Sequence, residues 1–239
     1  MYDLTKRVLD VTLASAAVSA LAVPLLGVAA VLRVTGEGKI FFPQQRIGHR
    51  NKPFKLLKFA TMLEDSPKTG TITVRDDPRV LPVGRVLRKT KINELPQLLN
   101  VIRGDMSLVG PRPLTDEAFS LYPDELKPLI YASKPGLTGI GSVVFRDEEA
   151  ILADSKKDRR TCYREDVMPI KGALEVWYTQ HKSTAVDLKI MALTAIAIVA
   201  PGNNLHRRWF KDLPDCEVGA TARAHDAHAT PADAPAPTN

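Results

Sequence analysis

Few aromatic residues and only two cysteines occur in this 239-residue chain. Aromatic residues make up 6% of the sequence, so the core is expected to be aliphatic. Cys162 and Cys216 do not form a disulfide framework, and no cysteine pair has zinc-ligand spacing, while the histidines are scattered. A disulfide-stapled secreted fold and a structural zinc site are therefore excluded, and a reducing, cytosolic environment is expected.

The charge of the chain is unevenly distributed. The formal net charge is +6, and residues 215–239 contain four acidic residues and one arginine, so residues 1–214 carry +9. A basic body indicates anionic partners, such as nucleic acid, lipid headgroups or phosphorylated small molecules. No RNP, helix-turn-helix or zinc signature is present, and the apolar N-terminus favours lipid. We therefore expect no nucleic-acid partner.

An uncharged segment of 22 residues runs from Val11 to Leu32, about the length that spans a bilayer as a helix. Lys6 and Arg7 precede it, and Arg33 follows it. Pro24 lies just past its middle and is expected to bend or break the helix. The residues alone leave two alternatives open: a kinked transmembrane helix, and a helix that returns to the same face and keeps all three basic residues cytoplasmic.

The middle of the chain predicts mixed secondary structure. Residues 39–42 and 54–59 are typical of short strands, and residues 135–139 of a turn. A helix is predicted over 93–102, with Asn93 as its N-cap, Glu94 in its first turn and Gly104 at its end. Residues 163–182 and 186–200 predict two further helices, the second too short to span a bilayer and suited to an interface or a core.

Several segments, taken in order, resemble the bacterial sugar transferase family, the small monotopic phosphoglycosyl transferases. The resemblance covers roughly residues 2–202, and the ordered set is highly specific although each fragment alone is weak. The matching stretches are Phe42–Gly48, Lys52–Phe54, Lys58–Met62, Asp77–Val80, Val83–Thr90, Asn93–Ile102, Gly104–Pro113, Pro135–Gly139 and Asp187–Lys189.

The resemblance implies an α+β, mainly helical protein. It implies a re-entrant, proline-broken membrane helix over residues 1–35, although Val23 stands where the family usually has a serine before the proline. A compact cytosolic catalytic domain with a few short strands and interfacial helices is expected over 36–210. Residues 211–239 are expected to be a disordered tail.

The implied activity is transfer of a sugar-1-phosphate from a UDP-sugar to polyprenyl (undecaprenyl) phosphate, with release of UMP. This is the first membrane step in the synthesis of exopolysaccharide, capsule, O-antigen or glycoprotein glycans. The expected location is the bacterial inner membrane, with the catalytic domain on its cytoplasmic face and membrane lipids as partners. The sequence identifies neither the sugar nor the oligomeric state, a homo-oligomer included.

The family places an Asp-Glu pair at the start of the 93–102 helix, and the aspartate is taken as the nucleophile. This chain has Asn93-Glu94 instead, and an amide is a poor nucleophile. Three alternatives follow. Glu94 supplies the nucleophile or base while Asn93 caps the helix and bonds a phosphate; polyprenyl phosphate attacks directly while Glu94 holds metal; or the protein is an inactive, membrane-bound scaffold for glycan assembly.

Other site residues are carried over by the resemblance. Lys58, Arg88, Arg112 and Arg146 are expected to bind substrate phosphates, with Arg112 presented by a Gly-Pro-Arg-Pro turn. Charge development on several phosphate oxygens implies a divalent cation, Mg²⁺, with Glu94 and Glu175 as its ligands. Glu175 stands where the family usually has aspartate.

Overall fold

The computed structural model describes residues 2–35, 37–63, 78–146, 148, 152, 155, 157–200 and 204–214. Within this part of the chain the protein is mainly helical with two small two-stranded sheets, which confirms the predicted balance of elements. Most of the predicted tail, residues 215–239, lies outside the described residues.

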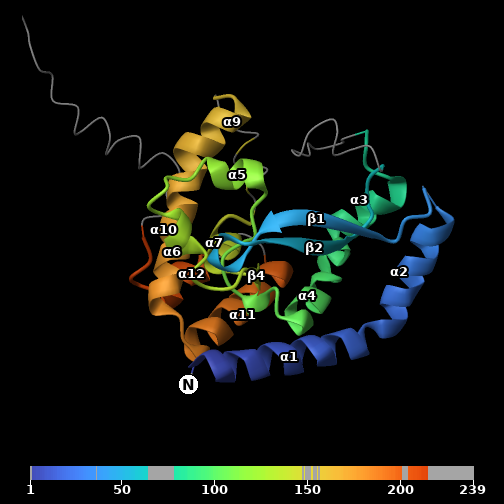
Figure 1. Cartoon of the computed structure of the whole chain (residues 1–239), viewed down its shortest axis with the longest axis horizontal. Coiled ribbons are helices and arrows are strands. Elements are labelled where there is room, and N and C mark those ends of the chain that lie inside the picture. Colours follow the sequence, from blue (N-terminus) through green and yellow to red (C-terminus); the bar gives the residue numbers. More distant parts are fainter. Residues whose placement is uncertain are drawn as a thin grey trace, which may run out of the picture.

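The apolar N-terminal segment forms two helices, α1 (Tyr2–Ala20) and α2 (Ala22–Val34), which are bent by 64° at Leu21 (Figure 1). Pro24 accounts for the break, because its nitrogen has no hydrogen to donate to the Ala20 carbonyl and its ring crowds the preceding turn. The predicted proline break is therefore confirmed. Among the described helices none alone is long and apolar enough to cross a bilayer, whereas the bent pair meets both criteria together.

The first half of α1 is fastened to the helix α4 (Gln97–Arg103) by an arginine. Arg7 donates hydrogen bonds to the carbonyl oxygens of Val101, at 2.6 Å, and Ile102, at 2.7 Å. These carbonyls belong to the last turn of α4, where the helix dipole favours a positive charge; that of Val101 also accepts a 3.1 Å hydrogen bond from the Gly104 nitrogen. The N-terminal segment is therefore tied to the domain by an ionic cap.

Removing this cap is expected to loosen the domain. The Arg7→Met substitution keeps much of the apolar stem but leaves two partly buried carbonyls without their charged donor, which costs about 2 kcal/mol of unfolding free energy. Thermal melting in detergent measures the loss. Arg103→Met is the matched control, because Arg103 is exposed in the same last turn of α4 and is expected to change stability by less than about 0.5 kcal/mol. Equal melting temperatures for the two variants would contradict the role of Arg7.

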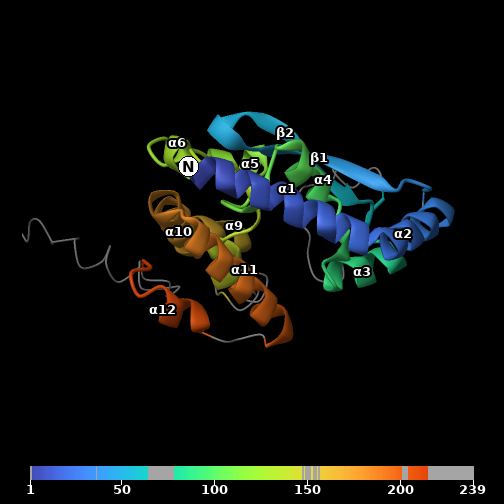
Figure 2. The same cartoon turned by 90° about the horizontal axis from the view of Figure 1, so that it is seen from below.

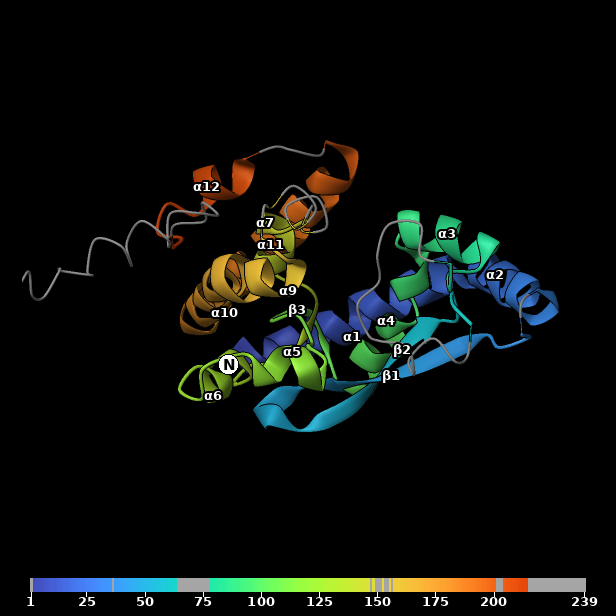
Figure 3. The same cartoon turned by 90° about the horizontal axis from the view of Figure 1, so that it is seen from above.

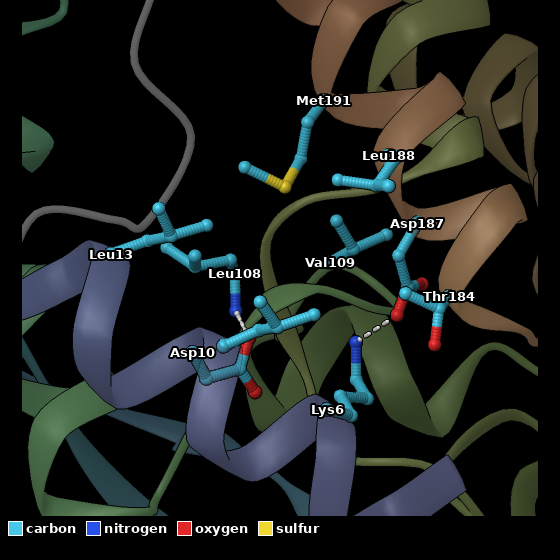
Figure 4. Close-up of a pocket in the computed structure, with 10 residues that line it drawn as sticks. Lys6, Asp10, Leu13, Leu108, Val109, Thr184, Asp187, Leu188 and Met191 are labelled. Atoms are coloured by element: carbon cyan, nitrogen blue, oxygen red, sulfur yellow. Dashed lines mark hydrogen bonds and ion pairs between the residues drawn. The ribbon is translucent and has the colours of Figure 1, made fainter.

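A second set of polar contacts joins α1 to the helix α11 (Thr184–Val199). Lys6 forms an ion pair of 2.8 Å with the buried carboxylate of Asp187, which also accepts a 2.7 Å hydrogen bond from the Tyr178 hydroxyl. Asp10, itself buried, accepts a 3.0 Å hydrogen bond from the backbone nitrogen of Leu108. Figure 4 shows the Lys6 and Asp10 contacts side by side in the small apolar space between the two helices. Seen from below, α1 crosses the underside of the molecule with α11 next to it (Figure 2).

Strands β1 (Phe41–Ile47) and β2 (Pro53–Phe59) form an antiparallel hairpin. Residues directly opposite each other share a face, so the pairs Arg46–Phe54 and Phe42–Lys58 lie on the same side as Leu56, which is buried. That side faces the domain. The strand predicted over 39–42 began two residues before β1 and ended too early. Its end was misplaced because the polar second half of β1, Gln44 to Arg46, was not taken as part of a strand.

The chain then passes through α3 (Pro82–Lys89) and the short 3-10 turn η3 (Ile92–Glu94) into α4. Gly104 ends α4 with a left-handed φ of 94°, as predicted. The predicted N-cap was wrong: α4 begins only at Gln97, and Asn93 lies inside η3 without a capping hydrogen bond. Pro96 in the N-cap position explains the delay, because its fixed φ and missing N–H suit the first turn of a helix.

A second, parallel sheet pairs β3 (Ser107–Val109) with β4 (Gly136–Thr138). The turn predicted over 135–139 therefore contains a strand, which the glycines and proline of this segment disguised. The C-terminal helices α10 (Met168–His181) and α11 confirm the two helices predicted there. The remaining short elements are η1 (His49–Asn51), α5 (Asp116–Ser120), α6 (Lys127–Ile130), α7 (Ile140–Val144), α9 (Arg159–Cys162), the π-helical turn η4 (Tyr163–Val167) and α12 (Leu205–Trp209).

Helix α4 lies at the centre of this arrangement, packed against both α1 and β2 (Figure 3). The main core joins α4, α10 and α11 through fully buried side chains such as Val101, Leu174 and Ile190. A smaller cluster packs α2 against α3 and β2 through Leu32, Leu87 and Phe59. The α3–η3–α4 segment is therefore clamped between the hairpin and the N-terminal helices.

Candidate active site

Glu94 is half-buried at the end of η3. The turn is introduced by Lys91, whose backbone has a left-handed φ of 61°, a conformation that residues other than glycine seldom adopt. This residue bends the chain sharply after α3 and brings η3 against β2. The carboxylate is thus held by a tight turn between two packed elements.

Four cationic side chains act electrostatically on the Glu94 carboxylate. Burial alone would raise the pKa of Glu94, but the positive charges of Arg112, Lys58, Lys91 and Arg46 outweigh it and lower the pKa from its ordinary value. Glu94 is therefore ionised at neutral pH. Three residues predicted from widely separated motifs, namely Glu94, Lys58 and Arg112, thus lie within electrostatic reach of one another.

Lys58 is the cation whose protonation is most affected by this site. Burial lowers its pKa to about 7, and the neighbouring positive charges of Arg46, Arg112 and Arg88 act in the same direction, against the attraction of Glu94. Arg88 is half-buried on α3, with its Nη1 3.6 Å from the sulfur of Met62. Lys58 and Arg88 therefore belong to the same cationic group, and their binding of substrate phosphates stays a prediction.

Arg46 belongs to the same group and was missed in the sequence. Its guanidinium donates to Gln44 Oε1 at 2.7 Å and to the carbonyl oxygen of Pro113 at 3.2 Å, so it joins β1 to the Gly110–Pro113 turn. Burial, followed by the charge of Arg112, lowers the pKa of Arg46 to about 10. The alternation of polar Gln44 and Arg46 on one face of a strand was the available signal, because such a face lines a site when it is turned inward.

Asn93 is buried next to Glu94 in the chain, with 7% of its surface exposed. Its Oδ1 atom has no hydrogen-bond partner within the described part of the protein. A buried carbonyl oxygen without a donor costs about 1–3 kcal/mol of stability. A ligand that supplies a hydrogen-bond donor or a cation to Asn93 Oδ1 would offset this cost.

Arg112 and Arg146, both predicted to bind phosphate, differ in their surroundings. The side chain of Arg112 is exposed at the rim of the site, and its charge acts on Glu94, Arg46 and Lys58. Arg146 is exposed beyond the end of α7. Among the described residues, it is not one of the charges that act most strongly on Glu94 or Lys58, and its role as a phosphate ligand remains a prediction.

Glu175 lies deeper than its predicted role as a metal ligand suggests. Its side chain on α10 is buried, and one oxygen accepts a 3.4 Å hydrogen bond from the backbone nitrogen of Arg112. Burial raises the pKa of Glu175 to about 7, opposed by that hydrogen bond and by the charges of Lys171 and Arg112. The carboxylate therefore supports the Arg112 turn from behind.

The site offers few oxygen ligands for a cation such as Mg²⁺. In the part of the chain that the structure describes, no three His, Cys, Asp or Glu side chains gather as a metal site. Mg²⁺, however, commonly takes only one or two protein oxygens and completes its shell with water and substrate phosphates. The ionised Glu94 and the unpartnered Asn93 Oδ1 satisfy this smaller requirement.

Known proteins are similar to this chain over most of its length. The model of the bacterial sugar transferase family matches residues 1–201. The chain belongs to this family. The exopolysaccharide production protein ExoY of Sinorhizobium fredii is 35% identical over 211 residues, which cover 82% of this sugar transferase and 85% of ExoY. UDP-glucose:undecaprenyl-phosphate glucose-1-phosphate transferase of Caulobacter vibrioides is 39% identical over 206 residues, which cover 84% of this chain and 72% of that protein. The UDP-N-acetylgalactosamine-undecaprenyl-phosphate N-acetylgalactosaminephosphotransferase of Aeromonas hydrophila is 35% identical over 202 residues, 83% of this sugar transferase and 44% of that protein.

Proposed function

We propose that this protein transfers a sugar-1-phosphate from a UDP-sugar to polyprenyl phosphate and releases UMP. The observation that carries the proposal is that the Glu94 carboxylate lies within electrostatic reach of four cationic side chains from separate segments of the chain. The names of the relatives from Caulobacter vibrioides and Aeromonas hydrophila describe sugar-phosphate transfer to undecaprenyl phosphate. The same reaction in this chain requires a site for several phosphate groups, which a basic group of this kind supplies.

The reaction brings a diphosphate and a phosphomonoester together. An oxygen of polyprenyl phosphate forms a bond to the β-phosphorus of the UDP-sugar, the bond from that phosphorus to the bridging oxygen breaks, and UMP leaves with the bridging oxygen. Lys58, Arg46, Arg88 and Arg112 offset the repulsion between the two anions and stabilise the charge on the transferring phosphoryl group. The negative charge of Glu94 partly offsets the repulsion among Lys58, Arg46 and Arg112. Glu94 and Asn93 Oδ1 would hold Mg²⁺, which would supply further positive charge to the diphosphate.

We further propose that α1 and α2 enter the cytoplasmic leaflet of the bacterial inner membrane and return to the same face. The bend at Leu21 supports this, as do exposed apolar side chains within α2 such as Val23 and Leu26, which are 80% and 70% exposed. A single reporter cysteine introduced at Thr5 or at Val34 in a chain without Cys162 and Cys216 tests the arrangement. Both cysteines are expected to react only with a reagent that reaches the cytoplasmic side, whereas a spanning helix exposes them on opposite sides.

The reaction itself is tested by UMP release from detergent-solubilised protein with undecaprenyl phosphate, Mg²⁺ and a panel of UDP-sugars. We expect UMP with at least one sugar nucleotide, and the panel also identifies the sugar. A protein that binds membranes but releases no UMP with any sugar in the panel would be the inactive scaffold.

The pH dependence of the reaction is expected to report Lys58. Its ammonium is charged below a pKa of about 7, so kcat/KM, which reflects the free enzyme, falls as the pH rises through that value. Lys58→Arg keeps its charge throughout and is expected to lose this fall. Lys55→Arg, on the exposed side of the same strand, is the control. It keeps Lys58, and the substrates and Glu175 contribute equally to the pH profiles of both variants, so a difference between the profiles is due to Lys58. An unchanged fall in Lys58→Arg would assign the titration to another group.

A further inference from the structure

The backbone of the Arg112 turn, defined as residues 110–113, is unusually well anchored. On one side it pairs with β4: Gly110 donates to the carbonyl of Thr138 at 2.9 Å, and Gly136 donates to the carbonyl of Pro111 at 2.8 Å. The approach is so close that a Cβ atom on Gly139 would lie 2.2 Å from the Gly110 oxygen. This part of the turn therefore has no freedom to shift.

The two polar backbone groups of Arg112 are held from outside the turn by side chains. Its carbonyl oxygen accepts a 2.8 Å hydrogen bond from the hydroxyl of Tyr131, which in turn accepts a 2.9 Å hydrogen bond from the backbone nitrogen of Leu114. Its nitrogen donates to Oε1 of Glu175 at 3.4 Å. Tyr131 is fully buried, and Glu175 is 5% exposed. The exposed guanidinium of Arg112 thus extends from a residue that two buried side chains hold on both sides.

Glu175 is enclosed by its neighbours. A Cβ atom on Gly141 would lie 2.5 Å from its Oε1, and its Oε2 has no hydrogen-bond partner within the described residues. Lys171, one helical turn earlier, is engaged by Glu148 at 2.6 Å instead. A carboxylate packed against glycine backbone in this way suits the support of a backbone amide better than a ligand shared with substrate phosphates.

We infer that Tyr131 and Glu175 are positioning residues, which set the location of the Arg112 guanidinium over the Glu94 site. The inference rests on the proposed function, because Arg112 is the group that meets the substrate. It also assigns Glu175 a role other than holding Mg²⁺. Neither residue contacts the reacting atoms, yet a displacement of about 1 Å in a charged group costs up to roughly 100-fold in rate.

The kinetic test compares Tyr131→Phe with Tyr122→Phe. Tyr122 is buried in the same apolar cluster as Tyr131. Its variant also loses a buried hydroxyl, but not the hydrogen bonds that Tyr131 makes to the Arg112 turn and to Leu114. Tyr131→Phe is expected to lower kcat/KM for the UDP-sugar by roughly 10- to 100-fold, and Tyr122→Phe by less than about twofold. In an Arg112→Ala background, Tyr131→Phe is expected to have no further effect, because the group that it positions is gone. An equal loss in both backgrounds would overturn the inference.

Glu175 is tested by comparing the glutamine and alanine variants. Glu175→Gln keeps an oxygen that accepts from the Arg112 amide and is expected to retain activity within about threefold, with an unchanged Mg²⁺ requirement. Glu175→Ala is expected to lose roughly 10- to 100-fold. If Glu175→Gln raises the Mg²⁺ concentration needed for half-maximal activity, Glu175 is a metal ligand and the positioning role is wrong.

Amide hydrogen exchange tests the anchoring without any substrate. In wild-type protein the amides of Arg112 and Leu114 are expected to be protected. Glu175→Ala is expected to accelerate exchange at Arg112 at least tenfold and Tyr131→Phe at Leu114, whereas Tyr122→Phe leaves both unchanged. Unchanged protection in the two test variants overturns the anchoring even if the enzyme proves active. A wild-type protein that releases no UMP but shows these changes would instead refute the proposed reaction while retaining the anchored turn.

Discussion

Glu94→Gln is expected to lower UMP release by about 10³-fold or more, the largest effect of any single substitution in this protein. The change is isosteric, so the volume of the side chain at position 94 is preserved. What is lost is the negative charge that Arg112, Lys58, Lys91 and Arg46 now surround. Their mutual repulsion is no longer offset, and the cations are expected to move apart. Every proposed role of Glu94, as nucleophile, base or metal ligand, is removed by the same change.

The measurement is the initial rate of UMP release with the best UDP-sugar, undecaprenyl phosphate and saturating Mg²⁺. Glu125→Gln is the matched control, because Glu125 is an exposed glutamate in the loop before α6, and it is expected to retain full activity. Thermal melting of both variants separates lost chemistry from lost folding. A folded Glu94→Gln protein with wild-type turnover would exclude η3 as the active site.

That Lys58 and Arg112 belong to the same site as Glu94 could be predicted only because whole motifs were recognised. Periodicity places Lys58 on a strand and Glu94 near a helix, but it does not bring two elements 36 positions apart together. That contact depends on β2 packing against η3, which is a tertiary interaction. The ordered set of motifs supplied what local patterns lack.

The errors have local physical causes. Asn93 is a favoured N-cap residue by propensity, but Pro96 moved the start of α4 to Gln97 and left Asn93 in a 3-10 turn. Arg46 was overlooked because its strand was ended at Phe42, before the alternation of Gln44 and Arg46 was counted. In both cases the decisive residues lay close to the assumed boundary: Pro96 is three residues after Asn93, and Gln44 and Arg46 are two and four residues after Phe42.

The predicted break at Pro24 was confirmed, also for a local reason. Pro24 affects the hydrogen bonding of its own preceding turn, so its effect does not depend on tertiary contacts. The bend occurs at Leu21, one turn before the proline, where the missing N–H and the ring act. The direction of α1 relative to the domain, in contrast, depends on Arg7 and Lys6, whose partners lie about 95 and 181 positions away. No pattern within the helix predicts those partners.

Asn93→Asp is expected to change the order of the reaction. An amide does not attack phosphorus, and the Glu94 carboxylate is held by four cations that lower its pKa, which makes its lone pairs less available for attack. We therefore expect the wild-type protein to release UMP only when polyprenyl phosphate is present, by direct transfer. Aspartate at position 93 places a second carboxylate beside Glu94. Because Asn93 Oδ1 has no hydrogen-bond partner among the described residues, we expect the corresponding aspartate oxygen to be available for attack.

The prediction is measured by omitting the acceptor. With a UDP-sugar and Mg²⁺ alone, Asn93→Asp is expected to release up to about one UMP per protein in a rapid burst. Intact-protein mass spectrometry should then show an added phosphosugar. Wild-type protein and the double variant Asn93→Asp/Glu94→Gln are the controls: the first is expected to show neither burst nor adduct, and the second shows whether Glu94 is needed for attack by the introduced aspartate. A burst with an adduct in the wild-type protein would instead identify Glu94 as the nucleophile, because it is the ionised carboxylate at the centre of the site, and would make the asparagine a phosphate-binding neighbour.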